Sequence, residues 1–118
     1  MARKRMNPDV VLKRTLVAAI HRAQKNGKKI GANNYGVRIV GGKFVAGKRC
    51  CPLGAYLDGK DAPEPNGNIE QNAEIYLGDI ATGIRDGVDN LSIFPSDSNI
   101  YRRGHAIGKE LRERFIEV

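Results

Sequence analysis

Apolar side chains recur at helical spacing near the start of the chain, which predicts an amphipathic helix over residues 8–25. Asn7 can cap this helix, and Pro8 suits its first turn because no backbone donor is needed there. Asn26-Gly27 supplies the left-handed residue that commonly ends a helix. The predicted buried stripe consists of Leu12, Leu16, Ala19, Ile20 and Ala23.

Between Tyr35 and Ala46 the pattern changes to short apolar and β-branched runs on either side of Gly41-Gly42. A glycine pair in this position predicts a β-hairpin, because the favoured two-residue turns need positive φ angles. Apolar side chains would then share one face of the hairpin, with Arg38 and Lys43 pointing elsewhere. An isolated hairpin is only marginally stable, so we expect this one to pack against the first helix.

The pattern after the hairpin predicts a series of helices. Pro52 suits the first turn of a short one, and a segment rich in proline and glycine indicates a loop after it. Asn68 and Asp79 can cap the next two helices. The last helix is the most regular amphipathic segment of the chain. In order, these helices cover residues 51–57, 69–77, 80–88 and 99–116, and the loop covers residues 58–68.

Glycines fall on the apolar face of two of these helices. Gly104 and Gly108 lie on this face of the last helix, and Gly83 and Gly87 have the same spacing in the helix before it. A glycine inside a helix costs about 1 kcal/mol relative to alanine, so we expect another backbone to come close at these positions. We predict that the two glycine faces meet, either within one chain or between two copies in a homo-oligomer.

These elements predict an α+β fold with a basic N-terminal helix, a β-hairpin and three to four further helices. A chain of 118 residues has the length of one domain, and 41% apolar with 28% charged residues is ordinary for a soluble globular protein. We expect a flexible basic arm over residues 1–6 and a single globular domain over residues 7–118. No signal peptide or membrane span is visible, and two adjacent cysteines are a poor basis for a secreted disulfide scaffold. The sequence therefore favours a cytoplasmic location without membrane contact.

Charge divides the chain into two unequal halves. Residues 1–49 carry 13 Lys or Arg and a single acid, Asp9, whereas residues 50–118 carry 7 bases and 12 acids. Most of the positive charge lies on the predicted first helix and hairpin, so it forms a shaped surface suited to an anionic partner. The candidate anion-binding residues are Arg3, Lys4, Arg5, Arg14, Arg22, Lys25, Lys28, Lys29, Arg38, Lys43, Lys48 and Arg49.

This charge distribution has three interpretations. The leading hypothesis is a small non-catalytic protein that contacts nucleic acid or a nucleoprotein complex, with binding that weakens steeply as salt rises. The alternative is an inhibitor or adaptor, such as a phage or mobile-element product, that docks on an acidic protein surface. The third is a solvated surface that only keeps the protein soluble.

The basic half contains no complete binding motif. No second helix closely follows the first, which disfavours a helix-turn-helix, and only Tyr35 and Phe44 are aromatic there, so no stacking platform for single strands is predicted. Residues 42–48 have the spacing of a phosphate-binding P-loop up to its lysine. Arg49 then replaces the Ser or Thr that would hold magnesium, and Phe44-Val45 suits a strand better. We therefore predict no nucleotide site and no cofactor.

Cys50-Cys51-Pro52 is the segment that most suggests catalysis. At a helix N-terminus behind two cations, Cys51 would have a lowered pKa, and His105 or His21 could act as its base. Two Cys and two His also suggest zinc, but adjacent cysteines lack the usual ligand spacing, and a vicinal disulfide would need strained geometry. Free cysteines are commonly buried, so the structural role is favoured. Cys51 and His105 are the catalytic candidates, and a binding protein is preferred over an enzyme.

Three carboxylates, Asp79, Asp86 and Asp89, lie near the end of one predicted helix. Such a group can hold a divalent ion, but its spacing fits no EF-hand loop. We therefore expect a solvated acidic face and predict no metal site.

Overall fold

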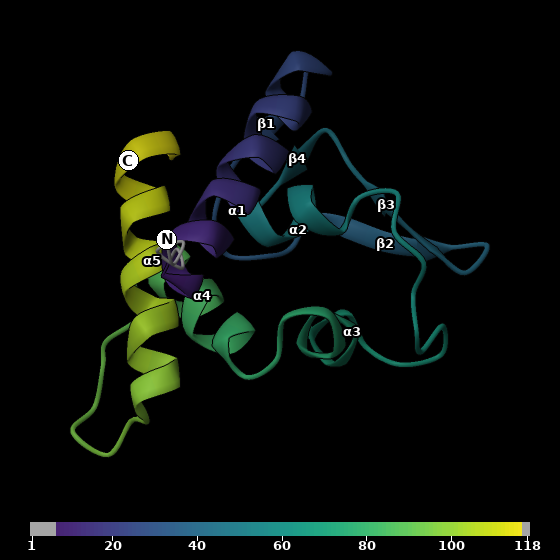
Figure 1. Cartoon of the computed structure of the whole chain (residues 1–118). Helices are drawn as coiled ribbons and strands as arrows, with labels where there is room; N and C mark the ends of the chain where they lie inside the picture. Colours follow the sequence, from purple (N-terminus) through teal and green to yellow (C-terminus); the bar gives the residue numbers. More distant parts are fainter. Residues whose placement is uncertain (1–6, 117–118) are drawn as a thin grey trace, which may run out of the picture.

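The computed structural model describes residues 7–116, in which one helix is followed by four short strands and then by four more helices (Figure 1). This arrangement confirms the predicted α+β class. The arm predicted over residues 1–6 lies outside the described residues, so the division into arm and domain stays a prediction. None of the helices within residues 7–116 has the length and apolarity needed to cross a membrane. The elements are α1 (Pro8–Lys25), β1 (Lys29–Ile30), β2 (Val37–Val40), β3 (Lys43–Ala46), β4 (Arg49–Cys50), α2 (Pro52–Leu57), α3 (Ile69–Leu77), α4 (Ile80–Val88) and α5 (Asn99–Phe115).

Most helix ends lie where the sequence predicts them. Asn7 caps α1 by accepting a 2.8 Å hydrogen bond from the backbone N–H of Asp9, and Asn68 forms a capping box at the start of α3. Gly27, just after α1, has a left-handed φ of +81°. The prediction that Asp79 caps α4 is wrong. Its backbone is helical and its side chain makes no capping hydrogen bond, whereas a capping residue is normally extended.

The predicted hairpin is confirmed. Strands β2 and β3 pair in antiparallel fashion around Gly41 and Gly42, whose φ angles are +59° and +77°. Val37 and Phe44 point into the core, and the cationic side chains of the hairpin are exposed. Residues 43–46 form β3. The segment with P-loop spacing is therefore mostly a strand and not a phosphate-binding loop, as the sequence indicates.

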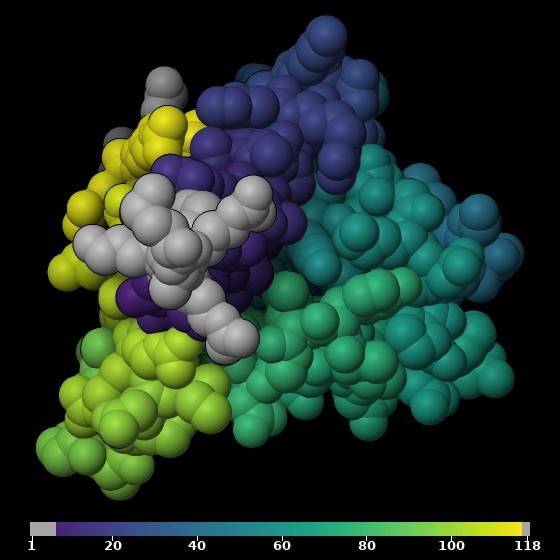
Figure 2. All heavy atoms as spheres, in the orientation of Figure 1, coloured from purple at the N-terminus to yellow at the C-terminus, as the bar shows by residue number. Residues whose placement is uncertain are grey.

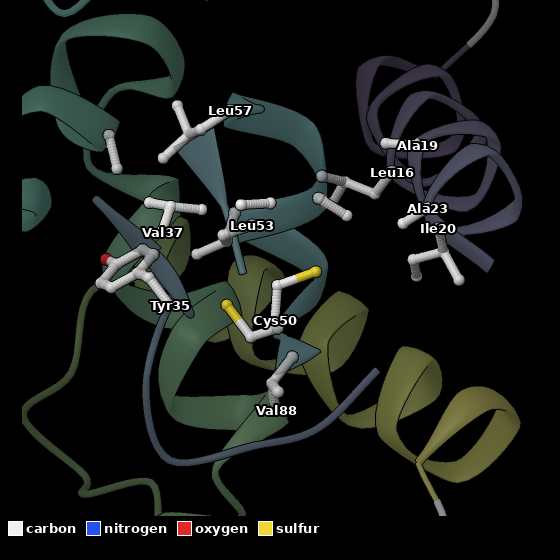
Figure 3. Close-up of a cluster of buried hydrophobic side chains, with 14 of the residues drawn as sticks. Leu16, Ala19, Ile20, Ala23, Tyr35, Val37, Cys50, Leu53, Leu57 and Val88 are labelled. Atoms are coloured by element: carbon white, nitrogen blue, oxygen red, sulfur yellow. The ribbon is translucent and has the colours of Figure 1, made fainter. Parts of the chain in front are cut away.

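The prediction that the hairpin packs against the first helix is wrong, because α2 lies between them. The hairpin packs on α2 and α3, and α1 packs on the other side of α2 (Figure 1). In the core, Leu53 of α2 lies between Leu16 of α1 and Val37 of β2 (Figure 3). Gly54 permits this close approach, since a Cβ there would overlap the carbonyl oxygen of Tyr35.

Strands β1 and β4 form a parallel pair that the sequence does not reveal. Each has two residues, too few to show any periodicity. The register pairs Lys29 with Arg49 and Ile30 with Cys50. Backbone bonds of 2.8 Å from Lys29 N–H to the carbonyl of Lys48 and 2.9 Å from Gly31 N–H to that of Cys50 hold the pair together. This pair ties the end of α1 to the segment that enters α2.

The two glycine faces meet within the chain. A Cβ at Gly87 of α4 would overlap the carbonyl oxygen of His105, and a Cβ at Gly108 of α5 would overlap that of Ile84. Gly83 and Gly104 meet the partner backbone in the same way. Each face is buried against the other, so neither is available to a second copy of the chain. The prediction of a homo-oligomer through these faces is therefore wrong.

Helix α5 also packs along α1, and two ion pairs join the helices. Arg103 donates bonds of 2.6 and 2.9 Å to the carboxylate of Asp9, and Lys13 lies 3.1 Å from a carboxylate oxygen of Glu110. The Arg103 hydrogen bond holds the pKa of Asp9 below its usual value. Figure 2 shows the two helices in contact along one side of the molecule. We call this contact region the α1/α5 seam.

Candidate anion-binding cleft

The structure separates the predicted basic residues into groups. Arg38 and Lys43 lie on the hairpin, whose turn is on the side of the molecule away from α5 (Figure 1). Arg14, Arg22 and Lys25 are exposed on α1, and Lys48 is exposed before β4. Three of the predicted residues come together around a single cleft, whereas Arg3, Lys4 and Arg5 lie outside the described residues. The three that line the cleft are Lys28, Lys29 and Arg49.

This basic cleft has a volume of about 670 Å³ and lies where the end of α1, the β1–β4 pair and the last turn of α5 converge. Arg112 of α5 adds a fourth cation to its lining. No acidic side chain is among the described residues that line it. The other lining residues are Gln24, Ile30, Gly31, Ala32, Asn33, Asn34, Cys50, Phe115 and Ile116.

Backbone carbonyls hold two of the four cations in place. The Nζ atom of Lys28 donates to the carbonyls of Ala46 and Gly47 at 3.0 and 3.3 Å, and Arg112 donates to the carbonyl of Val88 at 2.7 Å. These acceptors are neutral, so they orient the side chains without cancelling their charge. An ammonium has three N–H donors and a guanidinium has five, so both groups keep donors for a further acceptor.

The other two cations lie side by side because of the β1–β4 register. Lys29 and Arg49 are paired across the two strands, and both side chains are exposed. Arg49 lies over Gly31, where a Cβ would come within 2.8 Å of the guanidinium Nε. Like charges on neighbouring strands repel each other. An anion bound between them would relieve this repulsion.

Some cations elsewhere in residues 7–116 are paired with carboxylates. Lys13 pairs with Glu110, and Arg103 pairs with Asp9. On the hairpin, Lys43 lies 4.0 Å from a carboxylate oxygen of Asp61. None of the four cleft cations forms an ion pair with a carboxylate of the described residues. The cleft is therefore a place where positive charge gathers without compensation.

Sequence reasoning misses Arg112 and the loop that closes the cleft. Arg112 belongs to the acidic half of the chain, and only its place in the last turn of α5 could have drawn notice. The loop between β1 and β2 contributes Asn33 and Asn34, both exposed. Asn33 has a φ of +75°, and its N–H donates a 2.6 Å hydrogen bond to Asp89. This bond fixes the loop beside the cations.

A smaller groove of about 400 Å³ lies further along the α1/α5 seam. Its cations are Lys13, which is paired with Glu110, together with Arg14 and Arg114. It meets the basic cleft at a contact between two rings, because His21 lines the groove and Phe115 lines the cleft. The ring centroids are 5.6 Å apart and the rings are nearly perpendicular.

The two cysteines are buried free thiols. The Sγ atom of Cys51 accepts a 3.4 Å hydrogen bond from Gly54 N–H and so caps α2. The expectation of a lowered pKa is wrong, because burial outweighs the hydrogen bonds and raises the pKa of Cys51 to about 12. Both cysteines belong to the core cluster, as a structural role requires, and Figure 3 shows Cys50 there.

Neither histidine is engaged with Cys51. His105 is buried in α5, with Nε2 2.6 Å from the carbonyl oxygen of Leu91, and His21 contacts Phe115. Among residues 7–116, no group of His, Cys, Asp and Glu could hold a metal ion. Within the described part of the chain, Cys51 therefore has no histidine base beside it.

We expect both thiols to resist alkylation in the folded protein at about pH 8, because burial raises the pKa of each and little thiolate forms. Iodoacetamide labelling followed by mass spectrometry should be slow in native buffer and complete in denaturant. Rapid labelling of Cys51 in the folded protein would contradict a purely structural role.

The predicted solvated acidic face is only partly correct. Asp79 is exposed, but Asp86 and Asp89 are half-buried and hydrogen-bonded. Asp86 accepts a 2.5 Å bond from the Tyr101 hydroxyl, and Asp89 accepts the bond from the loop beside the cleft. These two carboxylates hold α4 to its neighbours, which occupies oxygens that solvent would otherwise contact.

Comparison with known proteins gives no functional assignment. No protein-family model, no curated protein and no solved structure matches the chain.

Proposed function

We propose that the protein is a small non-catalytic binding protein that contacts nucleic acid or a nucleoprotein complex through the basic cleft and the adjoining α1/α5 seam. The observation that carries this proposal is the convergence of four cations on one cleft without an acidic side chain among its described lining. Phosphates of a nucleic-acid backbone suit such a site, because arginine and lysine bind them through charge-assisted hydrogen bonds.

The shape of the cleft supports a chain-like anion over an acidic protein surface. Lys28 and Arg112 lie in the wall of a concave cleft. An extended polymer chain can enter such a cleft more easily than the surface of a folded protein can. A cytoplasmic location belongs to the same proposal, supported by two cysteines that serve the core as buried thiols. The competing proposal, an inhibitor or adaptor on an acidic protein, predicts a partner that is retained after nuclease treatment.

Salt dependence of binding tests the proposal. If the four cleft cations each neutralise one phosphate, affinity for a labelled oligonucleotide should fall roughly 50- to 150-fold between about 50 and 200 mM salt. Fluorescence anisotropy titrations at several salt concentrations give this slope. No binding at the lowest salt, or affinity that does not change with salt, would contradict the proposal.

A further inference from the structure

A ridge of planar side chains lies between the basic cleft and the smaller groove. It consists of His21 from α1 and of Arg114 and Phe115 from the end of α5. The Phe115 ring contacts His21, and the Arg114 guanidinium carbon lies 5.0 Å from the Phe115 ring centroid. Phe115 is half-buried, whereas His21 and Arg114 are exposed. The half-buried Phe115 ring therefore lies against two exposed planar groups.

Exposed planar groups between two basic hollows match the needs of a single nucleic-acid strand. Unpaired bases stack on histidine, aromatic and guanidinium planes, while the backbone follows a positively charged groove. We propose that the anion bound at the α1/α5 seam is a single strand of DNA or RNA, with phosphates in the basic cleft and a base stacked on the ridge. This inference rests on the proposed function and specifies its ligand.

The neutral lining of the cleft agrees with this ligand. Gln24, Asn33 and Asn34 expose amides, which can both donate to and accept from the edges of unpaired bases. Ile30 and Ile116 add apolar surface beside them. A site for phosphate alone would need only the four cations.

Duplex DNA serves as the sharpest comparison. A surface that binds only by charge favours a duplex, because binding releases more counterions from a duplex than from a single strand. The number released per neutralised phosphate is about 0.9 for a duplex and about 0.7 for a single strand. A duplex keeps its bases inside the helix, so it gains nothing from the ridge. Preference for the single strand therefore reports stacking and not charge.

The first experiment compares affinities at one salt concentration by anisotropy. The probes are single-stranded DNA, single-stranded RNA, the duplex of the same sequence, and heparin as an anionic chain without bases. We expect at least one single strand to bind several-fold more tightly than the duplex. Equal or tighter duplex binding would overturn this inference and leave the proposed function intact, whereas no binding to any nucleic acid would remove both.

The second experiment substitutes His21. Its side chain is exposed, so the substitution should leave the fold intact. His21→Ala should weaken single-strand binding about 5-fold or more, the effect typical of losing one stacked base, and leave heparin binding unchanged. His21→Tyr keeps a stacking plane and should retain most of the affinity. The stacking role would be overturned if His21→Ala lowered the affinity for heparin and for the single strand equally. It would also be overturned if His21→Tyr lowered the single-strand affinity as much as His21→Ala does. Thermal unfolding of both variants confirms that they are folded.

Discussion

Alanine in place of Gly87 or Gly108 will lower the free energy of unfolding by about 2 kcal/mol. At either position the new Cβ would overlap a backbone carbonyl oxygen of the facing helix. A backbone atom cannot rotate away, so α4 and α5 must separate. Such overpacking costs up to about 3 kcal/mol, which exceeds the gain of about 1 kcal/mol that alanine brings in helix propensity. Urea denaturation followed by circular dichroism measures the difference.

Gly47→Ala is the matched control for these substitutions. The nearest atom to a Cβ at Gly47 is 3.5 Å away, an ordinary van der Waals distance. Its unfolding free energy should therefore stay within about 0.5 kcal/mol of the unsubstituted protein. If Gly87→Ala instead stabilised the protein, helix propensity alone would govern this position and the close approach of the two helices would be refuted.

Reversing the paired cations of the basic cleft will abolish most of the nucleic-acid affinity. The double variant Lys29→Glu and Arg49→Glu removes two of the four cations and places two carboxylates beside a phosphate. Each charge-assisted hydrogen bond contributes about 1.5–3 kcal/mol, so the two together predict a loss of about 100-fold or more. The slope of the logarithm of affinity against the logarithm of salt concentration should also fall in magnitude by about 2. Anisotropy titration measures both effects, and both side chains are exposed, so folding should be retained.

The same charge reversal on the hairpin provides the control. Arg38→Glu with Lys43→Glu changes the net charge equally, at a site away from the α1/α5 seam (Figure 1). Lys43 already lies near Asp61, so its charge is partly compensated. We expect a loss of only a few-fold. Equal losses in the two double variants would show that total charge, and not the cleft, governs binding.

Helix and hairpin positions could be predicted because their signals are local. Asn7 and Gly27 mark the ends of α1 through a side-chain cap and a left-handed residue, and both effects involve neighbours within one turn. The Gly41-Gly42 turn acts in the same local way. The glycine spacing in α4 and α5 indicated a close contact. Only the structure showed that this contact lies within one chain.

The candidate site was much less predictable. Three of the basic residues singled out in the first half, Lys28, Lys29 and Arg49, line the same cleft. The charge pattern gave equal weight to Arg38 and Lys43, which lie elsewhere. The sequence did not reveal that His21, Arg114 and Phe115, which form the proposed stacking ridge, come together, because they belong to helices at opposite ends of the chain. The reactive-thiol interpretation required a lowered pKa of Cys51, but burial raises it instead, and the depth of burial is decided by the fold.

By itself, the sequence determined the type of each main element and the sign of the charge on the first half, because hydrophobic spacing, caps and turns act between near neighbours. The tertiary structure alone decided which charges converge. The two-residue strands β1 and β4 place Lys29 beside Arg49, and the packing of α5 on α1 brings Arg112 to them. Side chains separated by tens of residues meet only when the core closes. For this reason, the cleft that we propose as the binding surface follows from packing that no local pattern encodes.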